Sequence, residues 1–511
     1  METTQECNEL ISSLLRLGVR LWVEDGKLRF QAPKGVLLPE TREELRRRRR
    51  EVIRLLEKTD GLEDSPLTPR APGSVIPLTA MQRRRWLRRH EERRYRLRTG
   101  IIAIRVTGPL HAAHLQASLD ALVRRHEPLR TRIVEAAGIP CQQIDPASSY
   151  CLELIDLTKV TPEDADQTLR LLAEEFVSEE VDFSTGSLFA TKLFKLSNID
   201  HVLVITLNHM ISDGVSNEIL HKEIWSSYEL YRRGQKPSII PLPLQFADYA
   251  VWQKRNHNAW MRQHASYWRS HLAGAQPGYL KRDFEETPEK PCAAYFELEF
   301  GSEISTKLRQ LAQHEKCLLS IVVFAAYTAV MSKWCEKQDL VVRLIIDTRY
   351  RPELESMIGF IASHLYLRVQ KTPEDTFISY LRRLLHEFYS AYDHLDFDRV
   401  PDLLPGHAAT EIHFNWVPGS GIFSPDYCET LGALVLRRYP IPNARVLNFT
   451  AFFSDNATAI AATVAYRKDR FSSATLSRFG NALRHFAQTC VESPDVGLEL
   501  ALTRSYDILS G

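Results

Sequence analysis

A histidine, an aspartate and a glycine stand close together where an apolar run meets a helix-like segment, and together they could do acid–base chemistry. They are His209, Asp213 and Gly214, in the stretch NHMISDG. Imidazole has a reference pKa of about 6.5, so His209 could take a proton from an attacking nucleophile near neutral pH. Asp213 could fix the loop by hydrogen bonds, and Gly214 removes a side chain where backbone must bend or a ligand must pass. The pattern suggests a general base, although a structural histidine fits it too.

The elements on both sides of this loop follow from the apolar pattern. Residues 201–208, HVLVITLN, form a β-branched apolar run of strand length, and residues 215–231 carry apolar side chains at roughly helical spacing. The loop is therefore a tight strand-to-helix connection at the edge of a sheet. Such a connection can aim a base at a substrate.

Length and composition describe a globular chain. The 511 residues are 44% hydrophobic and 25% charged, with a formal net charge of +1, which fits two or three domains and gives no general reason to expect nucleic-acid or membrane binding. Eight cysteines without a CxxC pair argue against a zinc module or a disulfide framework. The N-terminus is not a signal peptide, and the apolar run 318–331 is too short to span a bilayer. We therefore expect a soluble, cytoplasmic protein.

The first 58 residues form a small module of their own. An apolar helix face ends at Gly18, and Asp25-Gly26 between two alternating segments predicts a β-hairpin over about residues 19–32, because a type I′ turn needs positive φ at both central positions. A hairpin has open edges that can accept an incoming strand. The side chains expected to bind a partner there are Leu21, Val23, Leu28 and Phe30.

A basic helix follows the hairpin, over residues 41–58. Its arginines, among them Arg47, Arg48 and Arg49, favour an acidic partner peptide, although a run of charge can also be only a solvated helix face. Residues 59–75 are rich in Pro, Gly and acidic residues without periodicity, and we interpret them as a linker.

NHMISDG resembles the HHxxxDG signature of the condensation domains of nonribosomal peptide synthetases, members of the chloramphenicol-acetyltransferase-like superfamily. In that family the second histidine, here His209, serves the condensation, while the aspartate and glycine shape the loop. The first histidine is replaced by Asn208. We expect Asn208 to keep a hydrogen-bonding role that supports the loop.

Other segments resemble further motifs of this family, in the family's order, over about residues 76–500. The resemblance implies that Asp213 pairs with an arginine, Arg349 as first choice and Arg351 as second. Ala362, Ser363 and His364 replace the usual Val-Asn-Thr. The motif-like segments are 76–86, 123–133, 245–253 and 349–369. In the second of them we interpret the polar residues as a structural network: Arg125, His126, Glu127, Arg130 and Arg132.

The resemblance implies an α/β fold of two chloramphenicol-acetyltransferase-like lobes forming a V-shaped pseudodimer. The first lobe is expected at residues 76–250 and the second at 251–511. The stretch LWVEDGKLRFQAPKG is similar to N-terminal β-hairpin docking domains of assembly lines, so residues 1–58 are expected to be a helix–hairpin–helix docking domain of α+β type. Such domains capture a short acidic segment at the C-terminus of an upstream synthase.

The implied function is that of a free-standing condensation enzyme. It would transfer an acyl chain from the phosphopantetheine thioester of an acyl carrier or peptidyl carrier protein to an amine or hydroxyl acceptor, either a small molecule or carrier-bound. No permanently bound cofactor and no metal are expected, and the chain is expected to be a monomer. Ser216 and Asn415 are candidates for stabilising the oxyanion.

Two alternatives stay open. The first is an acyltransferase of the same superfamily that uses a coenzyme A thioester, against which the docking module argues. The second is a catalytically silent domain that only recruits carrier proteins, an interpretation favoured by Asn208 and by the altered Ser363-His364.

Overall fold

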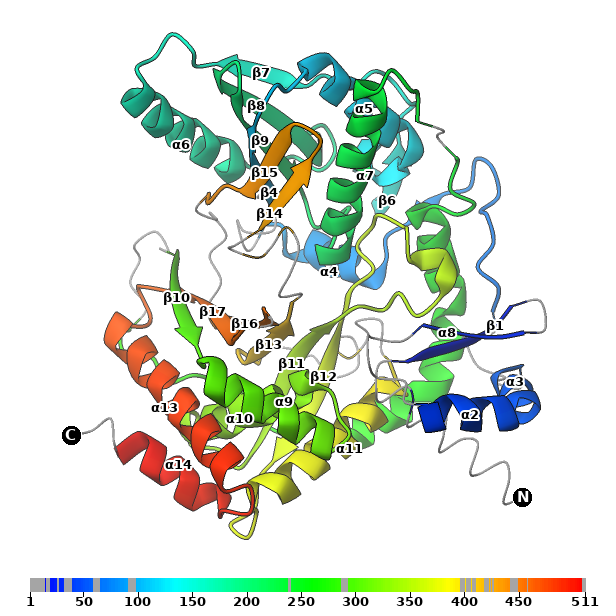
Figure 1. Ribbon diagram of the computed structural model, residues 1–511. Coiled ribbons are helices and arrows are strands. Elements are labelled where there is room, and N and C mark those ends of the chain that lie inside the picture. Colours follow the sequence, from blue (N-terminus) through cyan, green and yellow to red (C-terminus); the bar gives the residue numbers. More distant parts are fainter. Residues whose placement is uncertain are drawn as a thin grey trace.

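The computed structural model describes residues 19–24, 27–31, 39–57, 65–90, 98–237, 240–285, 293–395, 410–417, 427–441, 449–456 and 458–507, together with residues 14, 400, 406, 422 and 424. Two lobes, each built on a six-stranded sheet, face each other, and a small N-terminal module lies to one side (Figure 1). This is the predicted α/β architecture.

The first lobe has the strand order β14-β15-β4-β9-β8-β7. Helices α5 and α7 pack on one face of this sheet and α6 on the other, so β9 is buried from its second residue onward. The predicted strand at 201–208 is β9, and the predicted helix is α7. The elements are β4 (Gly100–Thr107), α5 (Ala112–Arg125), β7 (Glu153–Asp156), α6 (Pro162–Ser178), β8 (Phe189–Ser197), β9 (Asp200–Leu207) and α7 (Gly214–Arg232).

A small three-stranded sheet and helix α4 complete this lobe. The sheet has the order β3-β6-β5. Thr79 caps α4 in a capping box with Gln82, which fixes where the helix begins. The elements are β3 (Ile76–Pro77), α4 (Ala80–Arg88), β5 (Thr131–Ala136) and β6 (Ile139–Ile144).

The second lobe has the strand order β10-β17-β16-β13-β11-β12. Its helices lie on one side of the sheet, around a large apolar core, and the other face is turned toward the first lobe (Figure 1). The elements are β10 (Ala293–Glu299), α9 (Ser302–His314), α10 (Leu319–Trp334), β11 (Asp339–Ile346), β12 (Ser363–Gln370), α11 (Phe377–Tyr392), β13 (His413–Trp416), β16 (Phe449–Asp455), β17 (Ile460–Arg467), α13 (Ser473–Glu492) and α14 (Leu498–Asp507).

Within the described residues, no single helix has the length and apolar composition of a membrane span. Helices α9 and α10 meet those criteria only as a pair, and the pair is bent by 112°. Helix α10 is buried in the core of the second lobe.

One hairpin departs from the predicted division of the chain. Strands β14 (Cys428–Leu431) and β15 (Leu434–Arg438) were assigned with residues 251–511 to the second lobe, but β15 pairs with β4 of the first sheet. Leu434 and Leu436 are buried in the first lobe's core. The pairing covers the edge of β4, whose backbone groups would otherwise lack a neighbouring strand on that side.

A single helix, α8 (Phe246–His271), runs between the lobes, so the predicted boundary near residue 250 falls inside it. Near its start, Gln253 Oε1 accepts a hydrogen bond of 2.8 Å from the backbone of Ala80 in the first lobe. Near its end, Trp268 Nε1 donates one of 2.8 Å to His394 O in the second lobe. Helix α8 therefore ties the two lobes together.

The N-terminal module contains the predicted hairpin. Strands β1 (Arg20–Glu24) and β2 (Lys27–Gln31) are antiparallel, with Glu24 opposite Lys27. Asp25, Gly26 and the side chain of Val23 lie outside the described residues. So does the helix expected before Gly18, except for Leu14, which is helical and buried. Leu21 and Leu28 are half-buried, whereas Phe30 is 47% exposed.

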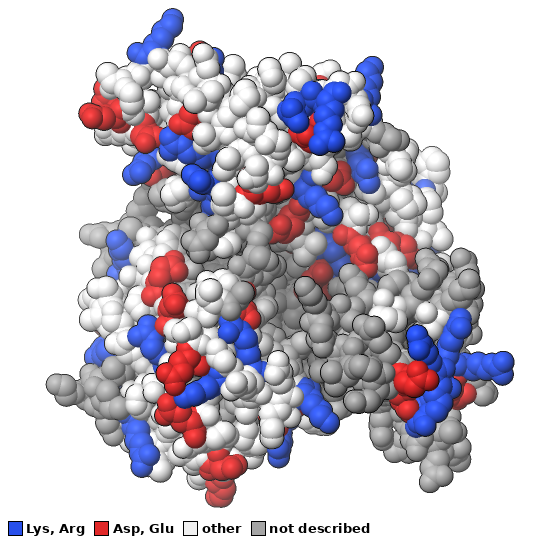
Figure 2. Space-filling view, in the orientation of Figure 1, with Lys and Arg blue, Asp and Glu red and all other residues white. Residues whose placement is uncertain are grey.

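The predicted basic helix is divided into α2 (Pro39–Arg47) and α3 (Arg49–Glu57). Hydrogen bonds of 3.0 Å from Arg48 N to Glu44 O and from Val52 N to Arg48 O bridge the break, so the irregularity is local. Arg47 and Arg48 both pair with Glu44, and Arg49 is exposed. Positive charge predominates on this part of the surface (Figure 2).

Three histidines lie where the end of α8 packs against the segment after α11. His264 Nδ1 is 2.8 Å from His394 Nδ1, so one nitrogen donates and the other accepts, and the two rings cannot both be protonated in this geometry. Tyr267 stacks between His394 and His271. Burial lowers the pKa of His264 to about 4, and burial with the nearby Arg368 lowers the pKa of His271 to about 4.

His264 and His271 predict an acid-sensitive second lobe. The pKa of each is about 4 in the folded chain and about 6.5 in the unfolded chain, so the unfolded chain binds more protons between these values. The free energy of unfolding should therefore be unaffected above about pH 6.5 and should fall as the pH drops toward about 4. Thermal unfolding from pH 7.5 to 4.5 measures this. The double variant His264→Gln, His271→Gln should have a flatter profile; an equally steep one would assign the effect to other groups.

Candidate functional site

The loop between β9 and α7 is held by elements of the first lobe. His209 N donates to Thr99 Oγ1 at 3.2 Å. Gln82 Nε2, from α4, donates to Met210 O at 2.6 Å. These contacts fix the backbone on both sides of the histidine side chain.

Asn208, which replaces the first signature histidine, makes hydrogen bonds within the loop between β9 and α7. Its side chain is fully buried, and Oδ1 accepts a hydrogen bond of 2.9 Å from Met210 N. Its carbonyl accepts another, of 3.2 Å, from Ser212 Oγ. Asn208 therefore makes two hydrogen bonds that close this loop.

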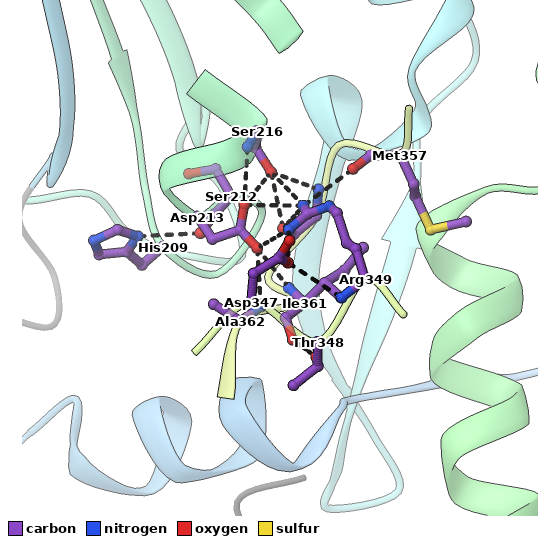
Figure 3. Close-up of polar contacts among 11 residues, drawn as sticks. His209, Ser212, Asp213, Ser216, Asp347, Thr348, Arg349, Met357, Ile361 and Ala362 are labelled. Carbon is purple, nitrogen blue, oxygen red and sulfur yellow. Dashed lines mark hydrogen bonds and ion pairs between the residues drawn. The ribbon is translucent and has the colours of Figure 1, made fainter. Parts of the chain in front are cut away.

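The imidazole of His209 has one nitrogen engaged with its own loop. Nδ1 lies 3.1 Å from Ser212 O, and because a carbonyl only accepts, Nδ1 must carry the proton. In the neutral ring Nε2 then keeps its lone pair and is the atom that can take a proton. Figure 3 shows the ring turned away from the polar cluster around Asp213.

Asp213 is the centre of that cluster. It caps α7 and is 2% exposed. Burial opposes its charge, but Arg349 and the surrounding hydrogen bonds hold the pKa of Asp213 below its ordinary value. Asp213 is thus an ionised anchor for the loop. Its oxygens accept six hydrogen bonds of 2.7–3.0 Å, from Ser216 N and Oγ, Arg349 Nη1 and Nη2, Ile361 N and Ala362 N.

Arg349 is the partner predicted for Asp213, and the two side chains form a buried ion pair of 2.9 Å (Figure 3). Its guanidinium also donates to Asp347 Oδ1 at 3.0 Å and to Met357 O at 3.2 Å. Arg349 lies between β11 and β12, so the pair joins the two lobes. Arg351, the second choice, instead donates to Ser65 O at 3.0 Å.

The two oxyanion candidates are engaged elsewhere. Ser216 is fully buried; its Oγ donates to Asp213 at 2.7 Å and accepts from Gly359 N at 3.0 Å. Asn415 lies on β13, where its Nδ2 donates to Ala451 O at 3.3 Å. In this structure Ser216 supports the cluster, and Asn415 is bonded within the second sheet.

Gly214 is the first residue of α7 and is exposed. Its φ lies outside the left-handed region, and an added Cβ would meet no heavy atom within 4 Å. A backbone bend therefore does not explain this glycine. The structure leaves open space beside this residue, and whether a ligand uses that space stays a prediction.

The structure also places residues that the sequence did not single out. Phe360 stacks against His209, with ring centroids 5.7 Å apart and 25° between the planes. Gly359 lies so close to α8 that a Cβ would come within 2.2 Å of Phe246. A glycine in the middle of an apolar segment is a sequence signal of such close packing. The sequence has no comparable signal that Phe360 stacks on His209.

The polar residues of segment 123–133 do form a structural network. His126 is fully buried, with Nε2 at 3.0 Å from Glu223 on α7. Arg132 pairs with Asp145. Among the described residues, no group of three or more His, Cys, Asp or Glu side chains is arranged to hold a metal ion.

Comparison with protein families identifies both parts of the chain. Residues 73–505 match the family described as "Condensation domain". The chain belongs to the condensation domain family. Condensation domains form amide bonds by acyl transfer. Residues 7–58 match the "TubC N-terminal docking domain", which agrees with the predicted docking module.

Curated relatives are long synthetases, of which this chain spans only a part. One of the linear gramicidin synthase proteins of Brevibacillus parabrevis is 27% identical over 444 residues, covering 83% of this chain and 8% of the synthase protein. The phosphinothricin tripeptide synthetase PhsC of Streptomyces viridochromogenes is 27% identical over 455 residues, covering 85% of this chain and 41% of the synthetase.

Solved structures share the fold. The X-domain from teicoplanin biosynthesis has a TM-score of 0.74 and 25% identity, covering 85% of this chain and 99% of the X-domain chain. The EpoB cyclization-docking bidomain from Sorangium cellulosum has a TM-score of 0.72 and 19% identity, covering 97% of this chain and 99% of the bidomain. The second match extends the likeness in fold to the arrangement of a docking module with a condensation-like pair of lobes.

The Asp213–Arg349 pair predicts a large loss of stability in Asp213→Ala. Removing the carboxylate leaves a buried guanidinium without its main counter-charge, which should lower the free energy of unfolding by roughly 3–5 kcal/mol. Chemical denaturation measures the loss. Adding Arg349→Met should restore part of it, because the remaining charge is then gone too. Equal losses in Asp213→Ala and in the control Arg351→Ala would contradict a special role for the pair.

The open space beside Gly214 predicts that a substitution there lowers activity without lowering stability. Gly214→Ala should keep or raise the melting temperature, because alanine is the better helix former and the added Cβ meets nothing. Transfer activity should fall if a ligand passes this residue. Gly497→Ala, another glycine with open space around it, is the control. Unchanged turnover in both Gly214→Ala and Gly214→Val would show that no ligand uses this space.

Proposed function

We propose that this protein transfers an acyl chain from the phosphopantetheine thioester of a carrier protein to an amine or hydroxyl acceptor, in a nonribosomal peptide or hybrid polyketide–peptide assembly line. The observation that carries the proposal is the state of His209. Its Nδ1 is engaged with Ser212 O, 3.1 Å away, which leaves Nε2 as the atom able to accept a proton. Membership of the condensation domain family supplies the reaction class.

The reaction needs one proton transfer and no covalent enzyme intermediate. The acceptor's nitrogen or oxygen attacks the thioester carbonyl and loses a proton to His209 Nε2. The carbon–sulfur bond then breaks, and the thiolate takes a proton back from the imidazolium. Positioning two substrates can contribute up to roughly 7–11 kcal/mol, and a positioned base roughly 10²–10⁴-fold in rate. A hydroxyl acceptor would depend on the base more than an amine.

We further propose that the donor arrives in trans through the N-terminal module. The hairpin offers strand edges, α3 packs against it, and Arg47, Arg48 and Arg49 lie at the junction of α2 and α3. An extended acidic segment at the C-terminus of an upstream synthase fits this surface, because it can add a strand and place its carboxylates near the arginines. The docking-family match over residues 7–58 supports this partner.

A second candidate function is recruitment without turnover. Asn208 replaces one signature histidine, and the X-domain that this chain resembles in fold has been solved in a complex with OxyB. In this alternative the lobes serve as a surface for another protein. The geometry around His209 favours the enzyme, because the loop is fully supported despite the replacement.

The deciding experiment mixes purified protein with an acyl-loaded carrier protein and candidate amine and alcohol acceptors, with intact-mass detection of product. We expect carrier-dependent product and a loss of roughly 10²-fold or more in His209→Ala, with an unchanged circular dichroism spectrum. Asn208→His should remain active. Complex formation without turnover in the unmodified protein would establish the recruiter instead, and a folded His209→Ala protein with full activity would exclude the proposed base.

The docking arginines give a kinetic prediction. Replacing Arg47, Arg48 and Arg49 by glutamate should slow association with the upstream partner. Added salt should slow the unmodified protein likewise, since exposed charges are screened over about 8–10 Å. Stopped-flow binding measures both. The control reverses three exposed cations of the second lobe, Lys468, Arg478 and Arg484. If neither added salt nor the replacement of the three arginines by glutamate changed the association rate, these arginines would contribute only to solubility.

A further inference from the structure

We propose that Phe360 is a positioning residue that sets the orientation of the His209 imidazole, an inference that rests on the proposed role of His209 as the base. The two rings are stacked, with centroids 5.7 Å apart and planes 25° from parallel. Phe360 is only 9% exposed. Its ring therefore lies against the imidazole in an offset stack and is itself held among other residues.

The stack supplies a constraint that the loop alone does not. The hydrogen bond from Nδ1 to Ser212 O, at 3.1 Å, fixes one point of the ring but allows it to tilt about that contact. A flat aromatic surface against the imidazole opposes the tilt, because stacked rings lose contact when one rotates. The two contacts together define the direction in which Nε2 points.

The backbone on both sides of Phe360 is tied down, so the ring cannot follow the imidazole if it moves. Gly359 N donates to Ser216 Oγ at 3.0 Å. Ile361 N and Ala362 N donate to Asp213 Oδ2 at 3.0 and 2.9 Å. Every one of these acceptors belongs to the start of α7, directly after the loop that carries His209. The segment that carries Phe360 is thus bonded to Asp213 and Ser216, which directly follow the loop that carries His209.

Further contacts support the ring from other elements. The Arg85 guanidinium carbon, on α4, lies 6.0 Å from the Phe360 ring centroid, at the outer limit of a cation–π contact. The backbone of Gly359 packs against Phe246 of α8. Phe360 comes from the second lobe and His209 from the first, so the orientation of the base depends on the contact between lobes.

The test compares variants that remove the aromatic ring with one that keeps it. In Phe360→Leu and Phe360→Met we expect kcat to fall by about 10- to 100-fold, the scale of a small misplacement of a reacting group, while KM changes less than about twofold. Phe360→Tyr should retain most of kcat. Phe414→Leu removes a buried ring from the same lobe, away from His209, and should lower the melting temperature without this loss of kcat.

A second readout does not require turnover, so it separates failure of this inference from failure of the proposed function. With ¹⁵N-labelled histidine, the His209 signals are assigned by their absence in His209→Gln. The unmodified protein should show one protonated and one unprotonated ring nitrogen with Nδ1 carrying the proton, and ring loss should shift both signals toward an averaged tautomer. Unchanged nitrogen shifts and unchanged kcat in both Phe360→Leu and Phe360→Met would overturn the positioning role. If the unmodified protein makes no product, the nitrogen shifts alone decide it.

Discussion

The buried ion pair between Asp213 and Arg349 is the interaction on which the site depends. A carboxylate and a guanidinium removed from water are each costly unless their mutual attraction and further hydrogen bonds compensate. Here Asp213 accepts six hydrogen bonds, and they come from both lobes. The same carboxylate caps α7, fixes the end of the loop and holds the segment after Gly359. Losing it would release all three at once.

This arrangement separates the residues that hold the site from the one that can react. The oxygens of Asp213 and the hydroxyl of Ser216 are committed to one another and to backbone groups. His209, on the other side of the loop, has Nδ1 engaged by Ser212 O, so in the neutral ring Nε2 is the nitrogen that carries the lone pair. Asn208, which replaces a signature histidine, belongs to the residues that hold the site, because its Oδ1 accepts a hydrogen bond from Met210 N.

The sequence predicted the parts of the fold that are encoded locally. The run 201–208, the helix after it and the Asp25-Gly26 hairpin follow from periodicity and turn chemistry, and the Asp213–Arg349 pair followed from family resemblance. The place of the β14–β15 strand pair could not be predicted in this way. The alternation of Leu434 and Leu436 shows that a strand is half-buried, but it does not show which sheet the strand joins. Phe360 was missed for a related reason: an aromatic residue in an apolar segment looks like core, and only the folded chain shows what it stacks on.

Among the described residues, several connections cross between the lobes, and they bear on how the site can be controlled. Helix α8 is continuous, β15 pairs with β4, and Asp213 is bonded to Arg349, Ile361 and Ala362. Each would have to break or bend before the lobes could separate at His209. Opening the site would thus expose a buried ion pair and an edge strand, both of which are costly. The loop that carries His209 is therefore held in place by contacts from both lobes.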